Sequence, residues 1–178
     1  MSKTWFITGA SAGLGRLMTE RLLIRGDQVV ATVRREDSVA DLRAQHGDRL
    51  VVSMLDLTDT AAIREVVDKS FRQLGRIDVI VSNAGYGLFG AAEEVTDAQI
   101  HHQIATNLLG SIQLIRAAIP HLRRLGGGRI VQVSSEGGQI AYPSFSLYHA
   151  TKWGIEGFIE SVAQEVTPFG IDSFAPIR

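Results

Sequence analysis

Short apolar runs alternate with longer amphipathic stretches along almost the whole chain. Six runs read as buried strands, at residues 4–8, 28–33, 50–55, 77–82, 130–133 and 170–175. The stretches between them predict helices at residues 14–24, 39–45, 59–74, 97–125 and 148–167, the fourth with a bend at Pro120. Strands that are apolar throughout and alternate with helices are typical of a parallel sheet covered on both faces.

The predicted fold class is therefore α/β, with a doubly wound parallel sheet of the Rossmann type in three layers. A length of 178 residues suits one domain over residues 1–178. In such sheets, ligands bind beyond the carboxyl ends of the strands. Candidate chemistry is therefore expected just after Thr8, Val33, Asp56, Ser82 and Val133.

Composition excludes several classes of function. The formal net charge of −1 provides no basic field for nucleic acid or an anionic membrane, and no apolar run is long enough to span a bilayer. The chain has no cysteine, which excludes disulfides and thiolate chemistry, and we expect a cytoplasmic protein. The five histidines lack metal-ligand spacing, so no metal site is expected.

A glycine-rich turn, T-G-x-x-x-G-x-G, follows the first predicted strand and precedes the first helix. Glycines let the backbone approach a pyrophosphate, whose charge is favoured at a helix N-terminus. Three glycines can also simply form a turn, but this position favours dinucleotide binding. The candidate cofactor-binding residues of the turn are Gly9, Ser11, Ala12, Gly13, Leu14 and Gly15.

Three further strand ends offer candidate contacts to a dinucleotide. Arg34 stands where an acidic residue would bind the ribose of NAD or an arginine would accommodate the 2′-phosphate of NADP, so NADP is favoured over NAD. The alternative is an arginine that is merely solvated. Asp56, followed by Leu57, is expected either to accept from the adenine amino group or to cap the next helix. The small residues that would let the backbone approach the adenosine are Asn83, Ala84 and Gly85.

Tyr148 and Lys152 stand four residues apart in a predicted helix, which places both side chains on one face. A phenol beside an ammonium can give or take a proton at a substrate oxygen. The alternative is an amphipathic helix with a half-buried tyrosine and a lysine that extends to solvent. Ser135, across a loop from Tyr148, can face the same site.

Five motifs occur together and in order: TGASAGLG at residues 8–15, SNAG at 82–85, Asn107 in TNLLGSIQL, VSS at 133–135 and YHATK at 148–152. With them the chain resembles the short-chain dehydrogenase/reductase family, from Thr4 to about Ile171. Val33 followed by Arg34 looks most like the NADP-linked steroid and retinol dehydrogenases or carbonyl reductases.

The resemblance implies a role for each of four catalytic residues. Tyr148 would be the proton donor or base, Lys152 would favour its phenolate and hold the nicotinamide ribose, Ser135 would polarise the substrate oxygen, and Asn107 would hold a water. The implied function is NADP-dependent hydride transfer to or from a secondary alcohol or ketone. The residues that line an apolar substrate pocket, or else belong to the core, are Tyr86, Leu88, Phe89, Tyr142 and Phe145.

Members of this family continue beyond the sixth strand with a further helix and strand, so the domain is expected to be incomplete at its C-terminus. The alternative function is therefore a weakly active or inactive dinucleotide-binding protein or an assembly partner. A sugar-nucleotide epimerase is disfavoured by the glycine spacing and the short chain.

A homodimer is expected through the helices at 107–125 and 148–167, as in the family. Gly154 and Gly157 would permit close helix approach. The apolar positions expected to exceed what one sheet face needs are Ile112, Ile115, Ala118, Ile119, Ile155, Phe158, Ile159 and Val162.

Overall fold

The computed structural model describes residues 2–176. Its strands are β1 (Thr4–Thr8), β2 (Gln28–Val33), β3 (Leu50–Met54), β4 (Val79–Ser82), β5 (Gly128–Gln132) and β6 (Ile171–Phe174). Its α-helices are α1 (Gly13–Ile24), α2 (Ala40–His46), α3 (Thr60–Leu74), α4 (Asp97–Ile104), α5 (Gly110–Arg124) and α6 (Ser146–Val166). Every predicted strand is confirmed to within two residues at each end.

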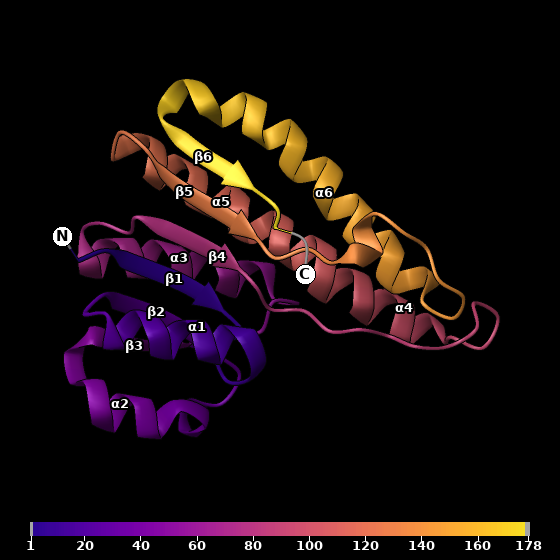
Figure 1. Cartoon of the computed structure of the whole chain (residues 1–178), viewed down its shortest axis with the longest axis horizontal. Helices are drawn as coiled ribbons and strands as arrows, with labels where there is room; N and C mark the ends of the chain where they lie inside the picture. The colour runs from indigo at the N-terminus through magenta and orange to yellow at the C-terminus, as the bar shows by residue number, and fades with distance from the viewer. Residues whose placement is uncertain (1, 177–178) are drawn as a thin grey trace.

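The six strands form one parallel sheet in the order β3-β2-β1-β4-β5-β6 (Figure 1). The chain builds outward from β1 to β3, then returns to the other side of β1 and builds from β4 to β6. The order thus reverses between β1 and β4, which confirms the doubly wound Rossmann-type fold. In such a sheet a crevice opens at the carboxyl ends of the two strands that flank the reversal.

Two hydrophobic cores lie on opposite faces of this sheet, because successive side chains of a strand point to opposite faces. Phe6 packs in the core that contains apolar side chains of α3, α5 and α6, whereas its neighbour Ile7 packs with those of α1 and α2. In β4, Ile80 likewise packs in the first of these cores and Val81 in the second. The uninterrupted apolar runs of the sequence are therefore explained by burial on both sides.

The predicted long helix over residues 97–125 is confirmed as a continuous helical stretch to Arg124, but a π-helical turn interrupts its α-helical geometry. Helix α4 ends at Ile104, a π-helical turn follows at Ala105–Leu109, and α5 then continues through Pro120 to Arg124. Gly110 begins α5 against the backbone of Leu57, where a Cβ atom would stand 2.7 Å from the Leu57 carbonyl oxygen. Turns of this kind occur often at functional sites, and this one carries Asn107.

The apolar surface expected for a dimer is smaller than the sequence indicated. Five of the eight positions named for it are at most 4% exposed and belong to the core of their own chain: Ile115, Ala118, Ile155, Ile159 and Val162. Gly154 faces Leu108 of the same chain, because a Cβ there would stand 3.3 Å from the Leu108 side chain. The large apolar side chains left exposed in this region are Leu109 and Trp153.

None of the helices within residues 2–176 combines the length and the apolar character needed to cross a membrane.

Candidate active site and cofactor cavity

A cavity of about 630 Å³ opens at the carboxyl ends of β1 to β4, where the sheet order reverses. This volume is in the range of cofactor sites. Predicted cofactor-binding residues form most of its wall: Gly9, Ser11, Ala12, Gly13, Leu14, Arg34, Asp56, Leu57, Asn83, Ala84 and Gly85. Gly15, Tyr148 and Lys152 are not part of this wall.

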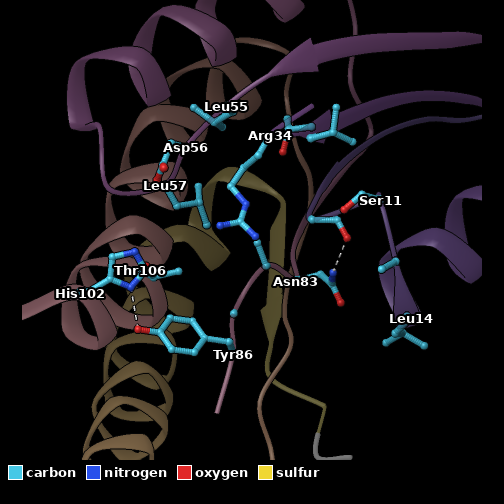
Figure 2. Close-up of a pocket in the computed structure, with 17 residues that line it drawn as sticks. Ser11, Leu14, Arg34, Leu55, Asp56, Leu57, Asn83, Tyr86, His102 and Thr106 are labelled. Carbon is cyan, nitrogen blue, oxygen red and sulfur yellow. Dashed lines mark hydrogen bonds between the residues drawn. The ribbon is translucent and has the colours of Figure 1, made fainter. Parts of the chain in front are cut away.

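The glycine-rich turn is held against the end of β4. The Thr8 hydroxyl accepts the backbone N–H groups of Asn83 (2.9 Å) and Ala84 (3.0 Å), while the Asn83 amide donates to the Thr8 carbonyl oxygen (2.9 Å). Figure 2 shows Asn83 directed at the turn beside Ser11. These bonds fix the turn so that the first turn of α1 faces the cavity, where a phosphate is favoured.

Gly15 packs this turn instead of lining the cavity. A Cβ atom at Gly15 would stand 2.3 Å from the Gly9 carbonyl oxygen and 2.5 Å from the Asn83 side-chain nitrogen. Neither neighbour can move freely, because one is backbone and the other holds the turn. Glycine is therefore required here by close approach, and Gly15 supports the cofactor cavity from behind.

Arg34 extends from the end of β2 and lines the cavity (Figure 2). It also lines a second, neighbouring hollow together with Ser11, Arg35 and Ser38. Arg16 of α1 donates to the Ser38 carbonyl oxygen (3.1 Å) and so fixes the far rim of that hollow. Two arginines and two hydroxyls around one hollow are suited to binding a phosphate.

Asp56 lines the cavity and does not cap α3, since the cap is Asp59, whose carboxylate accepts the Ala62 N–H (2.9 Å). Asp56 instead accepts the backbone N–H and the hydroxyl of Thr58, both at 2.8 Å. These two bonds, with a smaller contribution from the charge of Arg34, hold the pKa of Asp56 below its ordinary value. The carboxylate is thus an ionised acceptor at the cavity wall.

Tyr148 and Lys152 lie one turn apart on α6, as the spacing predicted. Lys152 is buried, with 8% of the residue exposed. Its ammonium donates to the Val133 carbonyl oxygen after β5 (3.0 Å) and lies 5.7 Å from the centre of the Tyr148 ring. The alternative of a lysine that extends to solvent is wrong.

Asn107 connects α6 to the cofactor cavity. Its side chain accepts the backbone N–H of Tyr86 (3.0 Å) and donates to the Tyr86 carbonyl oxygen (2.7 Å) and to the Thr151 hydroxyl (3.5 Å). Tyr86 lines the cavity, while Thr151 precedes Lys152 on α6. Asn107 therefore joins the two halves of the site, and its role in holding a water stays a prediction.

Ser135 follows β5, and its hydroxyl oxygen accepts the Gly137 N–H (3.1 Å). A hydroxyl that accepts one bond still has its own hydrogen to donate. A Cβ atom at Gly137 would stand 3.1 Å from the Tyr148 ring, so the Ser135 segment packs directly against Tyr148.

The cavity wall also contains His102 and Thr106, which were not predicted as site residues, and Tyr86, which was expected either to line a substrate pocket or to belong to the core. The Tyr86 hydroxyl and His102 Nδ1 are hydrogen-bonded at 2.7 Å, and burial raises the pKa of Tyr86 (Figure 2). In the sequence, only their positions near predicted site residues could have indicated these three side chains. Tyr86 follows Gly85, Thr106 precedes Asn107, and His102 lies one helical turn before Thr106.

Aromatic side chains gather beside Tyr148. Phe145 packs edge-on to Tyr148 (ring centres 6.1 Å apart) and to Phe89 (5.0 Å). Phe89 is 71% exposed and Tyr142 is 44% exposed, so the core alternative is wrong for both. Within residues 2–176 no group of three acidic or histidine side chains is arranged to hold a metal ion.

The chain belongs to the short-chain dehydrogenase family, whose family model, described as short chain dehydrogenase, matches residues 3–175. It is 40% identical over 172 residues to an oxidoreductase, BOA17, of Botryotinia fuckeliana. The alignment covers 96% of this chain and 63% of that relative. A solved short-chain dehydrogenase from Streptomyces avermitilis superposes with a TM-score of 0.95 at 40% identity, over 98% of this chain and 64% of that one. This chain thus spans less than two thirds of the length of these relatives.

Solved neighbours carry either nicotinamide cofactor. A metagenomic short-chain oxidoreductase in complex with NADP superposes with a TM-score of 0.94 at 28% identity, over 99% of this chain and 82% of that one. Carveol dehydrogenase from Mycobacterium avium, in complex with NAD, superposes with a TM-score of 0.90 at 33% identity. The match covers 97% of this chain and 69% of that one. Solved members of this family thus bind NADP or NAD.

We expect Gly15→Ala to cost about 1–3 kcal/mol of unfolding free energy, because the added methyl overpacks the turn. The fitting control is Gly157→Ala on α6, where a Cβ meets no atom within 4 Å and alanine should stabilise the helix by about 0.5–1 kcal/mol. Thermal unfolding and titration with NADPH measure both effects. Equal stability and cofactor affinity in the two variants would contradict the packing role of Gly15.

Proposed function

We propose that this chain is an NADP-dependent oxidoreductase that interconverts a secondary alcohol and a ketone. The observation that carries the proposal is the buried Lys152 side chain one helical turn from Tyr148, on a helix that Asn107 joins to the wall of a cavity suited to a dinucleotide. The family and the cofactors of the solved neighbours support it.

The residues of the cavity fit a nicotinamide dinucleotide. The first turn of α1 offers backbone N–H groups to the pyrophosphate. Asp56 provides an ionised acceptor for the adenine amino group, and the buried Thr106 hydroxyl, which has no partner among the described residues, offers a further polar contact. When bound, the cofactor supplies the hydride acceptor or donor.

The proton would be handled by residues of this chain. Tyr148 donates its phenolic proton to the oxygen of a ketone as that oxygen gains charge, and takes a proton from the alcohol in the reverse direction. The Lys152 ammonium, one helical turn away, would hold the hydroxyls of the nicotinamide ribose. Ser135 donates its free hydroxyl hydrogen to the same substrate oxygen and so holds it at Tyr148.

The substrate we propose is a small, largely apolar molecule. Phe89, Phe145 and Tyr142 present aromatic surface beside Tyr148, and Ile140 is 51% exposed in the same loop region. Exposed apolar side chains that gather at one site usually mark a binding surface. An apolar molecule with a single carbonyl group would match this surface, with the carbonyl oxygen directed to Ser135 and Tyr148.

Turnover tests the proposal directly, with NADPH consumption followed on a panel of steroid, retinoid and aromatic ketones. Tyr148→Phe should lower kcat about a hundredfold or more, because the proton donor is lost. Lys152→Met should also weaken NADPH binding, by about tenfold, since a charged hydrogen bond is lost. Lys69→Met, at an exposed position of α3, removes the same charge away from the site.

NADPH binding without turnover anywhere on the panel would contradict the proposed activity. It would support the alternative of a dinucleotide-binding protein that acts through a partner. If Lys152→Met bound NADPH as tightly as the unmutated protein, the assignment of Lys152 to the cofactor site would be wrong.

The preference for NADP rests on Arg34 and the hollow it shares with Arg35, Ser11 and Ser38. Arg34→Asp should weaken NADPH binding by about tenfold or more while leaving NADH binding within about twofold, because the carboxylate repels the 2′-phosphate. Arg72→Asp in the last turn of α3 is the charge control. Equal dissociation constants for the two cofactors in the unmutated protein would rule out the preference.

We also propose a homodimer, in which α5 and α6 pair with their counterparts across a two-fold axis. The support that remains is the exposure of two large apolar side chains, Leu109 and Trp153. Trp153→Glu should convert a dimer to a monomer at micromolar concentration, as light scattering would report. A monomeric unmutated protein under the same conditions would refute the dimer.

A further inference from the structure

Two buried polar side chains of α6 have no part in the proposed chemistry. His149 is 6% exposed and Glu156 is 8% exposed. They stand seven residues apart, which is about two helical turns, so they lie on the same side of α6. Both reach the segment 134–142 that leads from β5 to α6 and that carries Ser135.

Glu156 binds this segment at two points. One carboxylate oxygen accepts the Ser134 hydroxyl, and the other accepts the side-chain amide of Gln139. A buried carboxylate is costly unless its oxygens are hydrogen-bonded, and here both oxygens are used on one short segment. The two bonded residues, Ser134 and Gln139, lie on either side of Ser135 in the sequence.

His149 binds the same segment at two other points. Its Nε2 accepts the backbone N–H of Tyr142 (2.8 Å), so Nδ1 must carry the hydrogen and donate to the Gly137 carbonyl oxygen (2.8 Å). The imidazole therefore spans the loop from Gly137 to Tyr142. Since His149 adjoins Tyr148, this crosslink lies beside the proposed proton donor.

The segment itself is shaped to receive these two side chains. A Cβ atom at Gly137 would stand 2.9 Å from His149 Nδ1, and one at Gly138 would stand 2.0 Å from a Glu156 carboxylate oxygen. Each of the two adjacent glycines thus faces one of the two polar side chains. This pairing indicates that the loop and the helix fit as a unit.

We propose that His149 and Glu156 are positioning residues that clamp the segment 134–142 to α6. Because α6 also carries Tyr148 and Lys152, the clamp fixes Ser135 in the same rigid unit as the proton donor. The catalytic meaning of the clamp rests on the proposed function, whereas its effect on the loop does not.

Hydrogen–deuterium exchange on the cofactor-free chain tests the clamp independently of activity. We expect Glu156→Ala and His149→Phe each to speed exchange in the segment 134–142 by about tenfold, with β2 and β4 unchanged. NADPH affinity should stay within about twofold, because neither side chain lines the cofactor cavity. Glu160→Ala, at an exposed position one turn further along α6, should change nothing.

Rescue distinguishes positioning from a general packing defect. Glu156→Gln keeps the shape and can still bond both partners once the Gln139 amide rotates, so exchange should return to within about threefold of the unmutated protein. Where turnover is measurable, Glu156→Ala should lower kcat about tenfold with an unchanged KM for NADPH, and Glu156→Gln should recover most of it.

Exchange within twofold of the unmutated protein in Glu156→Ala and His149→Phe would overturn the clamp, and so would faster exchange spread evenly over the sheet. If both variants fail to fold, Gln139→Met removes one bond from the exposed side of the pair, and unchanged exchange there overturns it equally. An unmutated chain without turnover would refute the proposed oxidoreductase, while the exchange results would still decide the clamp.

Discussion

The site depends first on the hydrogen bonds between Thr8 and Asn83, which join the ends of β1 and β4. A doubly wound sheet reverses its strand order between these two strands, and the chain leaves them in different directions. Without a crosslink, the turn after β1 and the loop after β4 would be free to move apart. The Thr8 hydroxyl and the Asn83 amide prevent this with bonds of 2.9–3.0 Å. The cofactor cavity is therefore a property of the joined strand ends.

A second constraint places the chemistry. Helix α6 carries Tyr148 and Lys152, but the position of the Lys152 ammonium is fixed by a carbonyl oxygen of Val133 at the end of β5. Asn107 joins Tyr86 to α6, because it bonds the backbone N–H and carbonyl oxygen of Tyr86 and the hydroxyl of Thr151. Backbone atoms supply all but one of these partners, so the side chains from three distant parts of the chain are held in place by short, rigid contacts.

The fold was predictable from the sequence because its strands are buried on both faces, and such strands are continuous apolar runs. Motif positions predicted most of the cofactor wall, since consecutive parallel strands bring their ends to one edge. The π-turn at Ala105–Leu109 was not predictable, because the helical apolar pattern continues through it. Periodicity likewise did not show that Ile115 and Ile159 face their own core and not a partner. Tyr86 and His102 meet through tertiary packing, which no local pattern encodes.

The paired glycines at 137 and 138 have a consequence for how this site can change in evolution. Each leaves room for one particular side chain of α6, so a side chain added at either glycine would force its partner on α6 to move. A relative with a side chain at position 138 would need a smaller residue at position 156, and the same holds for positions 137 and 149. The two pairs should therefore covary across homologous sequences, and a loop grafted from another protein should function only when its helix partner is transferred with it.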